Sequence, residues 1–287
     1  MTTAPDPEGV LLVDKPAGLS SHAVVDRVRR ALGTRRVGHG GTLDPFATGL
    51  LTIFVGRATR LVPFVQQDPK IYRATIRFGA ATTTDDATGD VVREAPLPEA
   101  DRVTAALEAM TGHLLQRPPA YSAKQVGGVR AYAAARRGRP LSLEPVGVTV
   151  FQWTIIRMNG ADLDADISCS GGTYVRALAR DLGEASGSAA HLVALRRLRS
   201  GAFEVSAATS LDAVDRGLTN LMPSAAAVAH LAGQSLDDLD AKRIVHGQTV
   251  TARVTGELAA LTHADQLLAV AVREGDMWRP KVVMRDA

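Results

Sequence analysis

Short apolar runs and alternating positions predict strands in the first part of the chain. Residues 9–14 (GVLLVD) and 50–56 (LLTIFVG) are almost entirely apolar and of strand length, which is typical of buried strands. Residues 71–78 (IYRATIRF) alternate between polar and apolar side chains, as expected of a strand with one buried face. Tyr72 lies on the apolar face, at the start of that strand.

A helix is predicted between the first two strands. Ser20 or Ser21 can cap its N-terminus, and Gly33 follows Leu32 at the position where helices often end with glycine. One face of this helix is expected to be apolar and to pack against the strands. The residues of that face are Val24, Val25, Val28 and Leu32.

The same pattern continues toward the C-terminus. Strands are predicted at residues 147–158 and 162–170, and helices at 98–110, about 173–182 and 189–198. After an Ala/Ser-rich stretch, short apolar strands flank the turn Glu274-Gly275-Asp276. We therefore predict a mixed α/β domain over residues 1–229 and a small, mostly β domain over residues 230–287.

The composition is that of an ordinary folded protein. Apolar residues make up 46% of the chain and charged residues 22%, which argues against disorder of the whole chain. The first residues have no basic segment followed by an apolar one, so no secretory signal peptide is predicted. No apolar run approaches the ~18–20 residues needed to span a bilayer. We therefore expect a cytoplasmic protein without membrane contact.

A glycine-rich segment at residues 38–49 (GHGGTLDPFATG) contains the first candidate for chemistry. Asp44 precedes Pro45, a pair that is typical of a helix N-cap followed by proline in the first turn. Three glycines shortly before Asp44 instead favour a loop that a ligand or another segment approaches closely. In this second interpretation, Asp44 is a candidate nucleophile.

Arginine residues gather in three groups. They are Arg27, Arg29, Arg30, Arg35 and Arg36; Arg130, Arg136, Arg137 and Arg139; and Arg196, Arg197 and Arg199. Each group alone is compatible with a solvated helix face, but three groups together favour a polyanionic partner. Aromatic residues make up only 4% of the chain, so serial stacking of single-stranded bases is not indicated. RNA recognised by its shape, with one base extruded, fits better.

Other kinds of site are not indicated. The seven histidines show no spacing typical of a metal site, and the chain has no phosphate-binding glycine loop. A single cysteine excludes an internal disulfide. Cys169 lies in the apolar phase of its predicted strand, where we expect it to pack in the core rather than act as a nucleophile.

Six segments of the chain, in order, resemble motifs of the TruB family of tRNA pseudouridine synthases. The glycine-rich segment resembles the family signature G-H-x-G-x-L-D-P-x-A-x-G-[LM]-L, and VDKPAGLSSH (13–22) resembles its opening K-P motif. The other segments are KIYRATIRFGAATTTDDATGD (70–90), QRPPAYSA with GVRAYAAARRG (116–138), SGGTYVRALARDLG (170–183) and AHLVALRRLRSG (190–201). Together they cover nearly the whole predicted α/β domain.

The resemblance implies a fold and a reaction. The fold is an α/β fold of the mixed (α+β) kind, with a mixed sheet, flanking helices, a central cleft and an RNA-gripping insertion at about residues 116–140. The segment 230–287 resembles the family's small, mostly β PUA-like RNA-binding domain. The reaction is the isomerisation of uridine 55, in the T loop of tRNA, to pseudouridine. The family works without a metal or an organic cofactor, and we expect a monomer that needs no protein partner.

The resemblance also implies three catalytic residues. Asp44 would attack the uridine and help the base to detach, rotate and rejoin through carbon. Tyr72 would pack against the flipped base, and its phenol is a candidate for proton removal. Arg176 would pair with Asp44, and an adjacent arginine lowers the pKa of a carboxyl group by about 1–3 units, which suits a nucleophile that must be ionised.

Further residues are implied in binding the RNA. Leu195 would line the base pocket, and His39 would contact the RNA near the gap left by base flipping, which costs a few kcal/mol. The remaining expected contacts to the substrate come from Lys15, Arg130 and Tyr174.

Two alternatives remain open at this stage. A non-catalytic tRNA-binding or tRNA-folding chaperone would need only the arginine groups, and Asp44 would then be a helix cap. A guide-RNA-dependent pseudouridine synthase of the dyskerin type would work inside a multiprotein particle. The chain has no long lysine-rich tail, which favours a stand-alone enzyme. An enzyme acting on a small molecule is disfavoured by the missing cofactor motifs.

Overall fold

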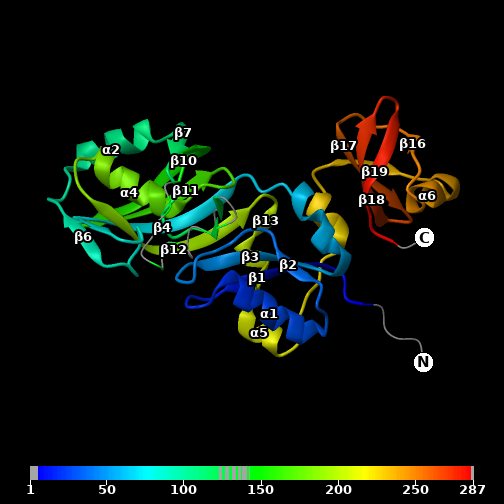
Figure 1. Cartoon of the computed structure of the whole chain (residues 1–287), viewed down its shortest axis with the longest axis horizontal. Helices are drawn as coiled ribbons and strands as arrows, with labels where there is room; N and C mark the ends of the chain where they lie inside the picture. The colour runs from blue at the N-terminus through cyan, green and yellow to red at the C-terminus, as the bar shows by residue number, and fades with distance from the viewer. Residues whose placement is uncertain are drawn as a thin grey trace. The chain divides into compact units, whose positions relative to one another are not determined.

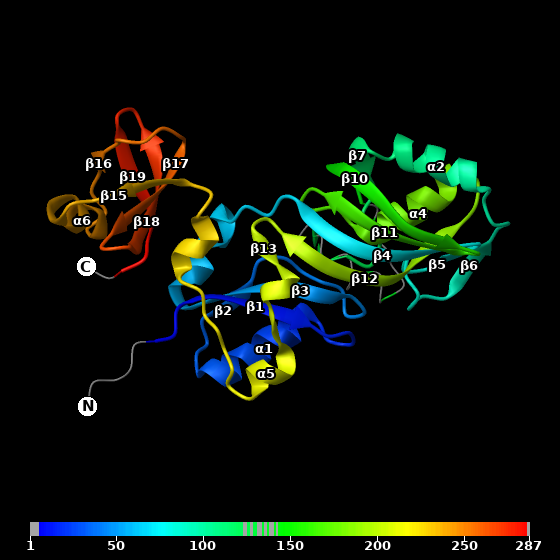
Figure 2. The same ribbon diagram turned by 180° about the vertical axis from the view of Figure 1, so that it is seen from behind.

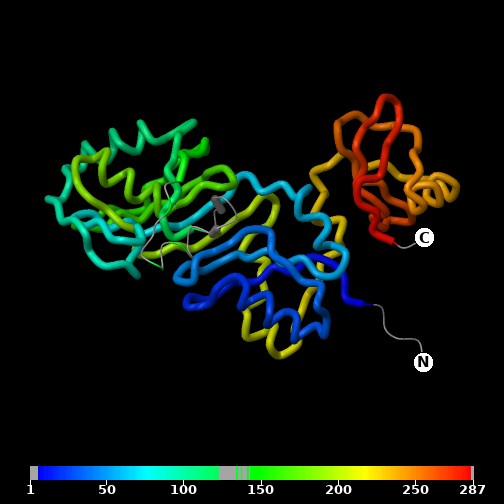
Figure 3. Tube along the Cα trace, viewed as in Figure 1, coloured from blue at the N-terminus to red at the C-terminus, as the bar shows by residue number. Residues whose placement is uncertain are grey.

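The computed structural model of the chain describes residues 6–122, 125–126, 129–130, 134, 137, 141 and 143–285. The backbone forms two compact units. Unit 1 comprises the residues up to Pro45, Gly49–Gln66 and the residues from Ala202 onward, and unit 2 comprises Phe46–Thr48 and Gln67–Gly201. The chain therefore leaves unit 1 after Gln66 and returns to it at Ala202, a path that can be followed by colour in Figure 3.

The N-terminal part of unit 1 is a small mixed sheet. Its strands are β1 (Gly9–Lys15), β2 (Val37–His39), β3 (Thr48–Val55) and β14 (Thr209–Ser210), and β13 (Phe203–Glu204) and η2 (Val205–Ala207) precede β14. β1 runs antiparallel to β3 and parallel to β14, and β2 pairs with β3 in the antiparallel sense. β1 and β3 are buried over almost their whole length. Both apolar runs are thus confirmed as buried strands.

Two helices pack against this sheet. They are α1 (Ser21–Leu32) and α5 (Leu211–Asp215), which contact each other and share an apolar core with β1 and β3 (Figure 1). The prediction for α1 is confirmed in detail. The Ser20 side chain accepts a hydrogen bond from the Ala23 N–H at 3.1 Å, and Gly33 ends the helix with φ of 64°.

The C-terminal part of unit 1 is a five-stranded sheet with one helix. In the order β15-β17-β18-β19-β16, the strands are Ala232–Ser235, Leu258–His263, Gln266–Glu274, Met277–Val283 and Val250–Thr251, and the helix is α6 (Asp238–Val245). β18 and β19 form the predicted hairpin around Gly275. Trp278 is fully buried, and its Nε1 donates to Gln234 Oε1 at 2.9 Å. The mostly β character predicted for this segment is confirmed.

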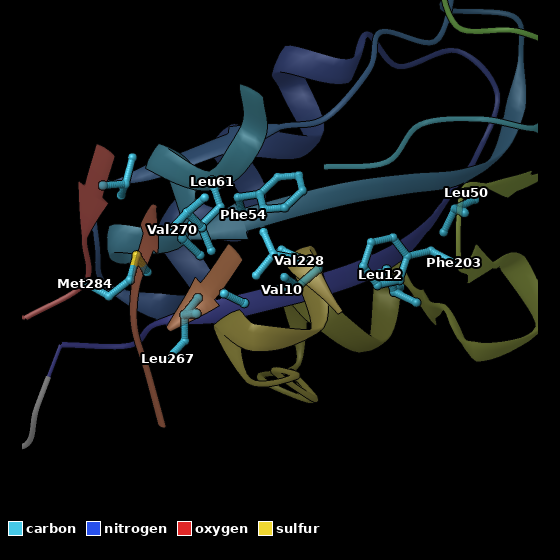
Figure 4. Close-up of a cluster of buried hydrophobic side chains, with 14 residues drawn as sticks. Val10, Leu12, Leu50, Phe54, Leu61, Phe203, Val228, Leu267, Val270 and Met284 are labelled. Atoms are coloured by element: carbon cyan, nitrogen blue, oxygen red, sulfur yellow. The ribbon is translucent and has the colours of Figure 1, made fainter. Parts of the chain in front are cut away.

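An apolar cluster joins the C-terminal part of unit 1 to the N-terminal part (Figure 4). The connecting elements are two 3-10 helices, η1 (Gly56–Phe64) and η3 (Ser224–Val228). Leu61 of η1 and Met284 belong to the same buried cluster. Arg57 and Arg60 of η1 donate to the main-chain oxygens of Met284 and Val283, at 2.9 and 2.7 Å. Apolar packing and hydrogen bonds therefore hold the C-terminal sheet on η1.

Unit 2 is built on an antiparallel sheet in the strand order β12-β4-β11-β10-β7. In that order the strands are Ala190–Ser200, Lys70–Phe78, Asp162–Cys169, Val146–Asn159 and Gly112–Gln116. Two hairpins add further strands to the described part of unit 2. They pair β5 (Ala80–Thr82) with β6 (Val91–Glu94), and β8 (Gln125–Val126) with β9 (Val129–Arg130).

The two faces of the unit 2 sheet differ in chemistry. Helices α2 (Ala100–Ala109) and α4 (Val175–Ala185) contact each other and lie on one face (Figures 1 and 2). The side chains of β4 and β11 alternate between buried and more exposed, as the sequence predicts. On the outer face, Arg73 makes two hydrogen bonds of 2.9 Å to Asp166, and such exposed pairs contribute little stability.

Residues 190–200 form the strand β12, where the sequence predicted a helix over 189–198. That helix prediction was wrong. Ala, Leu and Arg favour helices, but pairing with β4 along the strand overrides this local preference. Register shifts between Leu192 and Ala194, and between Arg197 and Arg199, interrupt the strand. Each shift breaks the alternation of polar and apolar residues that would have identified a strand.

The mixed α/β fold with flanking helices is confirmed, together with its small, mostly β C-terminal part. The boundary between residues 229 and 230 stays a prediction, as does the central cleft. Of the expected RNA-gripping insertion, residues 123–124, 127–128, 131–133, 135–136 and 138–140 lie outside the described residues.

Candidate active site

Asp44 lies in the loop between β2 and β3, and the start of α1 holds this loop in position. The buried Ser21 hydroxyl accepts a hydrogen bond from the Leu43 N–H at 2.8 Å and donates to the Leu43 carbonyl oxygen at 3.1 Å. The Gly18 N–H donates to the carbonyl oxygen of Pro45 at 2.8 Å. The residues on both sides of Asp44 are therefore fixed by hydrogen bonds to the segment before and at the start of α1.

Lys15 supports the same loop from inside unit 1. Its side chain is fully buried, and its ammonium group donates to the carbonyl oxygens of Pro16 at 2.9 Å, Leu19 at 2.6 Å and Pro45 at 3.2 Å. Carbonyl oxygens replace part of the hydration that a buried cation loses. These contacts give Lys15 a positioning role for the Asp44 loop, and its expected contact with RNA stays a prediction.

Asp44 does not cap a helix. The chain continues from Pro45 through bends into β3, which begins at Thr48. The capping alternative is therefore wrong. One of the preceding glycines has a packing reason: a Cβ on Gly40 would lie 2.7 Å from Cε2 of the Phe54 ring. At least part of the glycine signal thus reflects close approach of another segment of the same chain.

His39 ends β2, opposite Ile53 of β3, and is half-buried. Its Nδ1 accepts a hydrogen bond from the Gly41 N–H at 3.4 Å, so the imidazole is bonded to the start of the Asp44 loop. His39, Lys15 and Asp44 thus belong to one connected part of unit 1.

Tyr72 and Leu195 lie on the same face of the unit 2 sheet. Tyr72 is buried on β4, and its partner on β12 is Arg197. Leu195, also buried, lies opposite Ala74, two residues beyond Tyr72 on the strand. The structure therefore brings together an aromatic ring and an aliphatic side chain, the kind of surface against which a flipped base can pack.

Arg176 lies in the first turn of α4 and is almost completely buried. Its guanidinium donates to the main-chain oxygens of Thr84 at 3.0 Å and Tyr121 at 2.8 Å. Nη1 also lies 3.6 Å from Oδ2 of Asp86. A buried guanidinium needs such partners, because the charge has lost most of its water. Its expected pairing with Asp44 stays a prediction.

Asp86 fixes the loop that faces Arg176. Its Oδ1 accepts hydrogen bonds from the Thr84 hydroxyl at 2.7 Å and from the N–H and hydroxyl of Thr88 at 2.9 and 2.5 Å. The neighbouring Asp85 has a positive φ of 58° and pairs with Arg180 Nη1 at 3.0 Å. Burial raises the pKa of Asp85, and the positive charge of Arg180 opposes that rise.

Gln116 ties the end of β7 to the start of α4. Its Nε2 donates to the Tyr174 carbonyl oxygen at 3.1 Å, and its Oε1 accepts from the Tyr174 N–H at 2.8 Å. Tyr174, an expected substrate contact, is thus half-buried at the N-terminus of α4 with both main-chain groups held by one amide.

Asp86 and Gln116 were missed as functional candidates by sequence reasoning. Both lie in segments that carry the family motifs, but a polar loop and a strand end gave no reason to single them out. One signal was available for the acidic loop. Arg176 and Arg180 are four residues apart on one helix face, and a pair of neighbouring carboxylates elsewhere in the chain is a natural partner for them.

The first and third arginine groups are partly engaged within the protein. Arg27 pairs with Asp215 at 3.1 Å, and Arg29 donates to Asp26 at 2.9 Å. Arg35 and Arg36 are exposed, whereas Arg197 is buried on β12. For the second group, Arg136 and Arg139 lie outside the described residues.

Arg130 pairs with Gln125 across the β8–β9 hairpin through its backbone, and its side chain is outside the part of the chain that the structure describes. Its expected contact with RNA stays a prediction.

Cys169 is fully buried on β11, and burial raises the pKa of its thiol to about 11. Core packing is thus favoured over a role as nucleophile, as the sequence predicts. Among the described helices, none is both long and apolar enough to cross a membrane.

Comparison with known families gives two matches. Residues 29–175 match the family described as TruB family pseudouridylate synthase, N-terminal domain. Residues 176–224 match the tRNA pseudouridylate synthase B C-terminal domain. The two matches meet directly before Arg176 and together include all the expected site residues except Lys15.

Three relatives that match over almost their whole length carry the same name. The chain is 44% identical to tRNA pseudouridine synthase B of Thermobifida fusca (strain YX), over 96% of this chain and 98% of that protein. It is 42% identical to the protein of the same name from Mycobacterium tuberculosis (strain ATCC 25618 / H37Rv), over 97% of this chain and 96% of the relative. A third relative of that name, from Gloeobacter violaceus, is 43% identical over 96% of this chain and 99% of its own length.

Solved structures agree in fold. The chain resembles a protein in the crystal structure of the archaeal box H/ACA sRNP Nop10-Cbf5 complex with a TM-score of 0.73 and 23% identity, over 99% of this chain and 89% of that chain. For a Cbf5-Nop10-Gar1 complex the TM-score is 0.72, with 25% identity over 97% and 85% of the two chains. With a carboxylate loop in unit 1, an aromatic and aliphatic surface in unit 2, and family matches over both, the chain belongs to the TruB family of pseudouridylate synthases.

Proposed function

We propose that this protein isomerises uridine 55 in the T loop of tRNA to pseudouridine, with Asp44 as the nucleophile. The observation that carries the proposal is the position of Asp44, which lies in a loop held by Ser21 and Lys15 and caps no helix. The loop also has the family signature, and relatives of 42–44% identity over almost the whole chain are named tRNA pseudouridine synthase B.

The reaction is an isomerisation and needs no net reagent. The bond between N1 of uracil and C1′ of the ribose breaks, the base rotates, and a bond from C5 to C1′ forms. C5 then loses its proton, and N1 carries a hydrogen in the product. In the proposal, the Asp44 carboxylate supplies the electron pair that holds the sugar or the base while the base turns. Asp44 departs unchanged at the end of the cycle.

Unit 2 supplies the remaining roles in this proposal. Tyr72 stacks against the flipped base, with its phenol as a candidate for removing the C5 proton, and Leu195 lines the pocket. The buried Arg176 pairs with Asp44 and keeps the carboxyl ionised, since a nearby positive charge favours the charged form. The buried surroundings of Arg176 support this role, because its field is little screened by water.

The proposed RNA contacts come from residues of unit 1 and from arginine side chains. His39 fills the gap left by the flipped nucleotide, and exposed Arg35 and Arg36 are suited to phosphates. Lys15, Tyr174 and Arg130 complete the proposed contacts to the T arm. We further propose that the protein is a cytoplasmic monomer that acts without a protein partner, a metal or a cofactor. Its catalytic domain would span residues 1–229, and its PUA-like RNA-binding domain residues 230–287.

The test is to map pseudouridine on an unmodified tRNA transcript by carbodiimide labelling and primer extension. The purified protein should produce one new stop at uridine 55. Asp44→Asn should abolish the stop and still bind the transcript, because the amide keeps the shape of the side chain and loses its nucleophilicity. Asp265→Asn is the matched control, since Asp265 is exposed and its φ of 59° is tolerated by asparagine.

The alternatives give different outcomes. A stop that is equally strong with Asp44→Asn would remove Asp44 from the mechanism and leave the activity intact. Tight binding without any stop would overturn the stand-alone enzyme and favour the chaperone. Product that forms only after a guide RNA and partner proteins are added would favour the particle-dependent branch, whose fold this chain resembles.

A further inference from the structure

Gln116 is the last residue of β7 and its side chain is almost completely buried, with 1% exposed. Its amide satisfies the donor and the acceptor of one residue, Tyr174, at 3.1 and 2.8 Å. This is the pattern by which a residue in one strand of an antiparallel sheet pairs with its neighbour. The glutamine amide is neutral and carries a donor and an acceptor side by side. It can therefore make both bonds to Tyr174 without taking up or losing a proton.

Tyr174 is the residue from which α4 starts. Its carbonyl oxygen also accepts the helical hydrogen bond from the Leu178 N–H at 3.1 Å, and its own side chain makes no capping bond. The bonds from Gln116 therefore set where α4 begins. Arg176 follows two residues later, so its direction depends on that starting point.

The segment that follows Gln116 is held by α4 in return. Arg176 donates to the Tyr121 carbonyl oxygen at 2.8 Å, and Arg180 donates to the Arg117 carbonyl oxygen at 2.9 Å. Residues 116–121 and the start of α4 are thus joined at three positions, each by a side chain bonded to main chain. Among these three side chains, Gln116 differs from Arg176 and Arg180 in two ways. It is uncharged, and it binds both the N–H and the carbonyl oxygen of one residue.

We propose that Gln116 is a positioning residue of the reaction: through its two hydrogen bonds to Tyr174 it sets the backbone that carries Arg176, one of the proposed catalytic residues. Gln116 acts through Tyr174 and Arg176 and contacts no substrate itself. This inference rests on the proposed function, in which Arg176 pairs with Asp44 and keeps its carboxyl group ionised. It predicts that loss of the Gln116 bonds reduces kcat and leaves tRNA binding nearly unchanged.

A glutamate at this position makes the inference testable by pH. A protonated glutamic acid has one O–H donor and one carbonyl acceptor, as the amide does, whereas an ionised carboxylate has no donor and places negative charge against the Tyr174 carbonyl oxygen. Burial raises the pKa of a carboxyl group above its ordinary value of about 4.3. Gln116→Glu should therefore regain the native pairing as the pH falls.

The measurement is the single-turnover rate of Gln116→Glu divided by that of the wild type, from about pH 8 to about pH 5.5. Dividing by the wild type removes the effects of pH on Asp44 and on the RNA. At about pH 8 we expect a ratio of about 0.1 or less, because one lost hydrogen bond lowers the rate by about a factor of ten. At about pH 5.5 the ratio should rise toward 1. Gln152→Glu is the matched control, since Gln152 is exposed on β10, and its ratio should stay near 1 throughout.

Gln116→Met keeps the inference falsifiable if the glutamate variant does not fold. Methionine has a similar length and no amide, so we expect about tenfold lower kcat at every pH, with KM changed less than about threefold. A flat ratio for Gln116→Glu, or an effect on KM alone in Gln116→Met, would overturn the positioning role. Failure of the wild type to form product would instead overturn the proposed function.

Discussion

Arg176 and Asp86 form a buried ion pair in unit 2, with 3.6 Å between Nη1 and Oδ2. Removing one charge of a buried pair leaves the other without compensation, which costs about 3–5 kcal/mol in the free energy of unfolding. We expect Asp86→Asn to lie near the lower end of that range, since Arg176 keeps its bonds to Thr84 and Tyr121. Urea unfolding followed by circular dichroism measures the change.

Asp90→Asn provides the control for this prediction. Asp90 lies in the same loop but is exposed, so the substitution should change the free energy of unfolding by less than about 0.5 kcal/mol. Equal effects of the two substitutions would mean that the Arg176–Asp86 pair does not stabilise the fold.

Lys15→Met should weaken the Asp44 loop. The substitution leaves the carbonyl oxygens of Pro16, Leu19 and Pro45 without their buried donor. The Pro45 carbonyl oxygen keeps its hydrogen bond from the Gly18 N–H, whereas those of Pro16 and Leu19 lose a buried donor at about 1–3 kcal/mol each. We therefore expect a loss of about 3 kcal/mol in the free energy of unfolding. The rate of pseudouridine formation should fall more than the tRNA affinity, which filter binding can measure. Lys242→Met, at an exposed position of α6, should alter neither quantity.

Lys70→Met should stabilise the protein at neutral pH. Burial lowers the pKa of Lys70, and the positive charge of Arg197 lowers it further. The folded state therefore binds this proton less readily than the unfolded chain, which costs stability below the folded-state pKa. The wild type recovers that stability as the pH rises through the lowered pKa toward 10.5, the ordinary value.

The advantage of Lys70→Met in the free energy of unfolding should accordingly shrink as the pH rises. Urea unfolding of both proteins at about pH 7, 8.5 and 10 measures it. An advantage that stays constant or grows over this range would contradict the lowered pKa. Lys281→Met, at an exposed position on β19, should show no such trend.

Leu61→Ala should loosen the attachment of the C-terminal sheet. Leu61 is fully buried in the cluster that contains Met284 and Val270, and such truncations cost about 2–5 kcal/mol. Limited proteolysis should release the C-terminal part of unit 1 faster in this variant. Leu239→Ala should leave the cleavage rate unchanged, because Leu239 is 60% exposed on α6. Unchanged cleavage in Leu61→Ala would mean that the cluster does not hold the sheet.

Sequence predicted the structure best where the determinants are local. The ends of α1 were correct because the Ser20 cap and the αL glycine at position 33 act within one helical turn. The buried faces of β4 and β11 were correct because each strand alternates without interruption along its length. β12 was predicted wrongly because its bulges remove that alternation, and only pairing with β4 reveals the strand.

The candidate site was accessible from sequence only through motifs. Spacing alone left Asp44 as a nucleophile or a helix cap. The absence of a helix after Pro45 excludes the cap, and the role of nucleophile stays a prediction. The burial of Arg176, and its contacts with Asp86 and Tyr121, depend on segments far apart in the chain. The positions of Gln116 and Tyr174 are likewise set by the fold, so no local pattern could pair them.

The insertion of unit 2 within the sequence of unit 1 has a consequence for the order of folding during synthesis. A ribosome releases β1 early, yet Val13 of β1 pairs with Thr209, which emerges only after the whole of unit 2. Strands whose partners come from distant sequence form late, because loop closure must precede their contacts. We therefore expect the nascent chain to fold unit 2 while the apolar surfaces of β1 and β3 still await β14 and α5. That interval is when the growing protein is most exposed to aggregation and to chaperones.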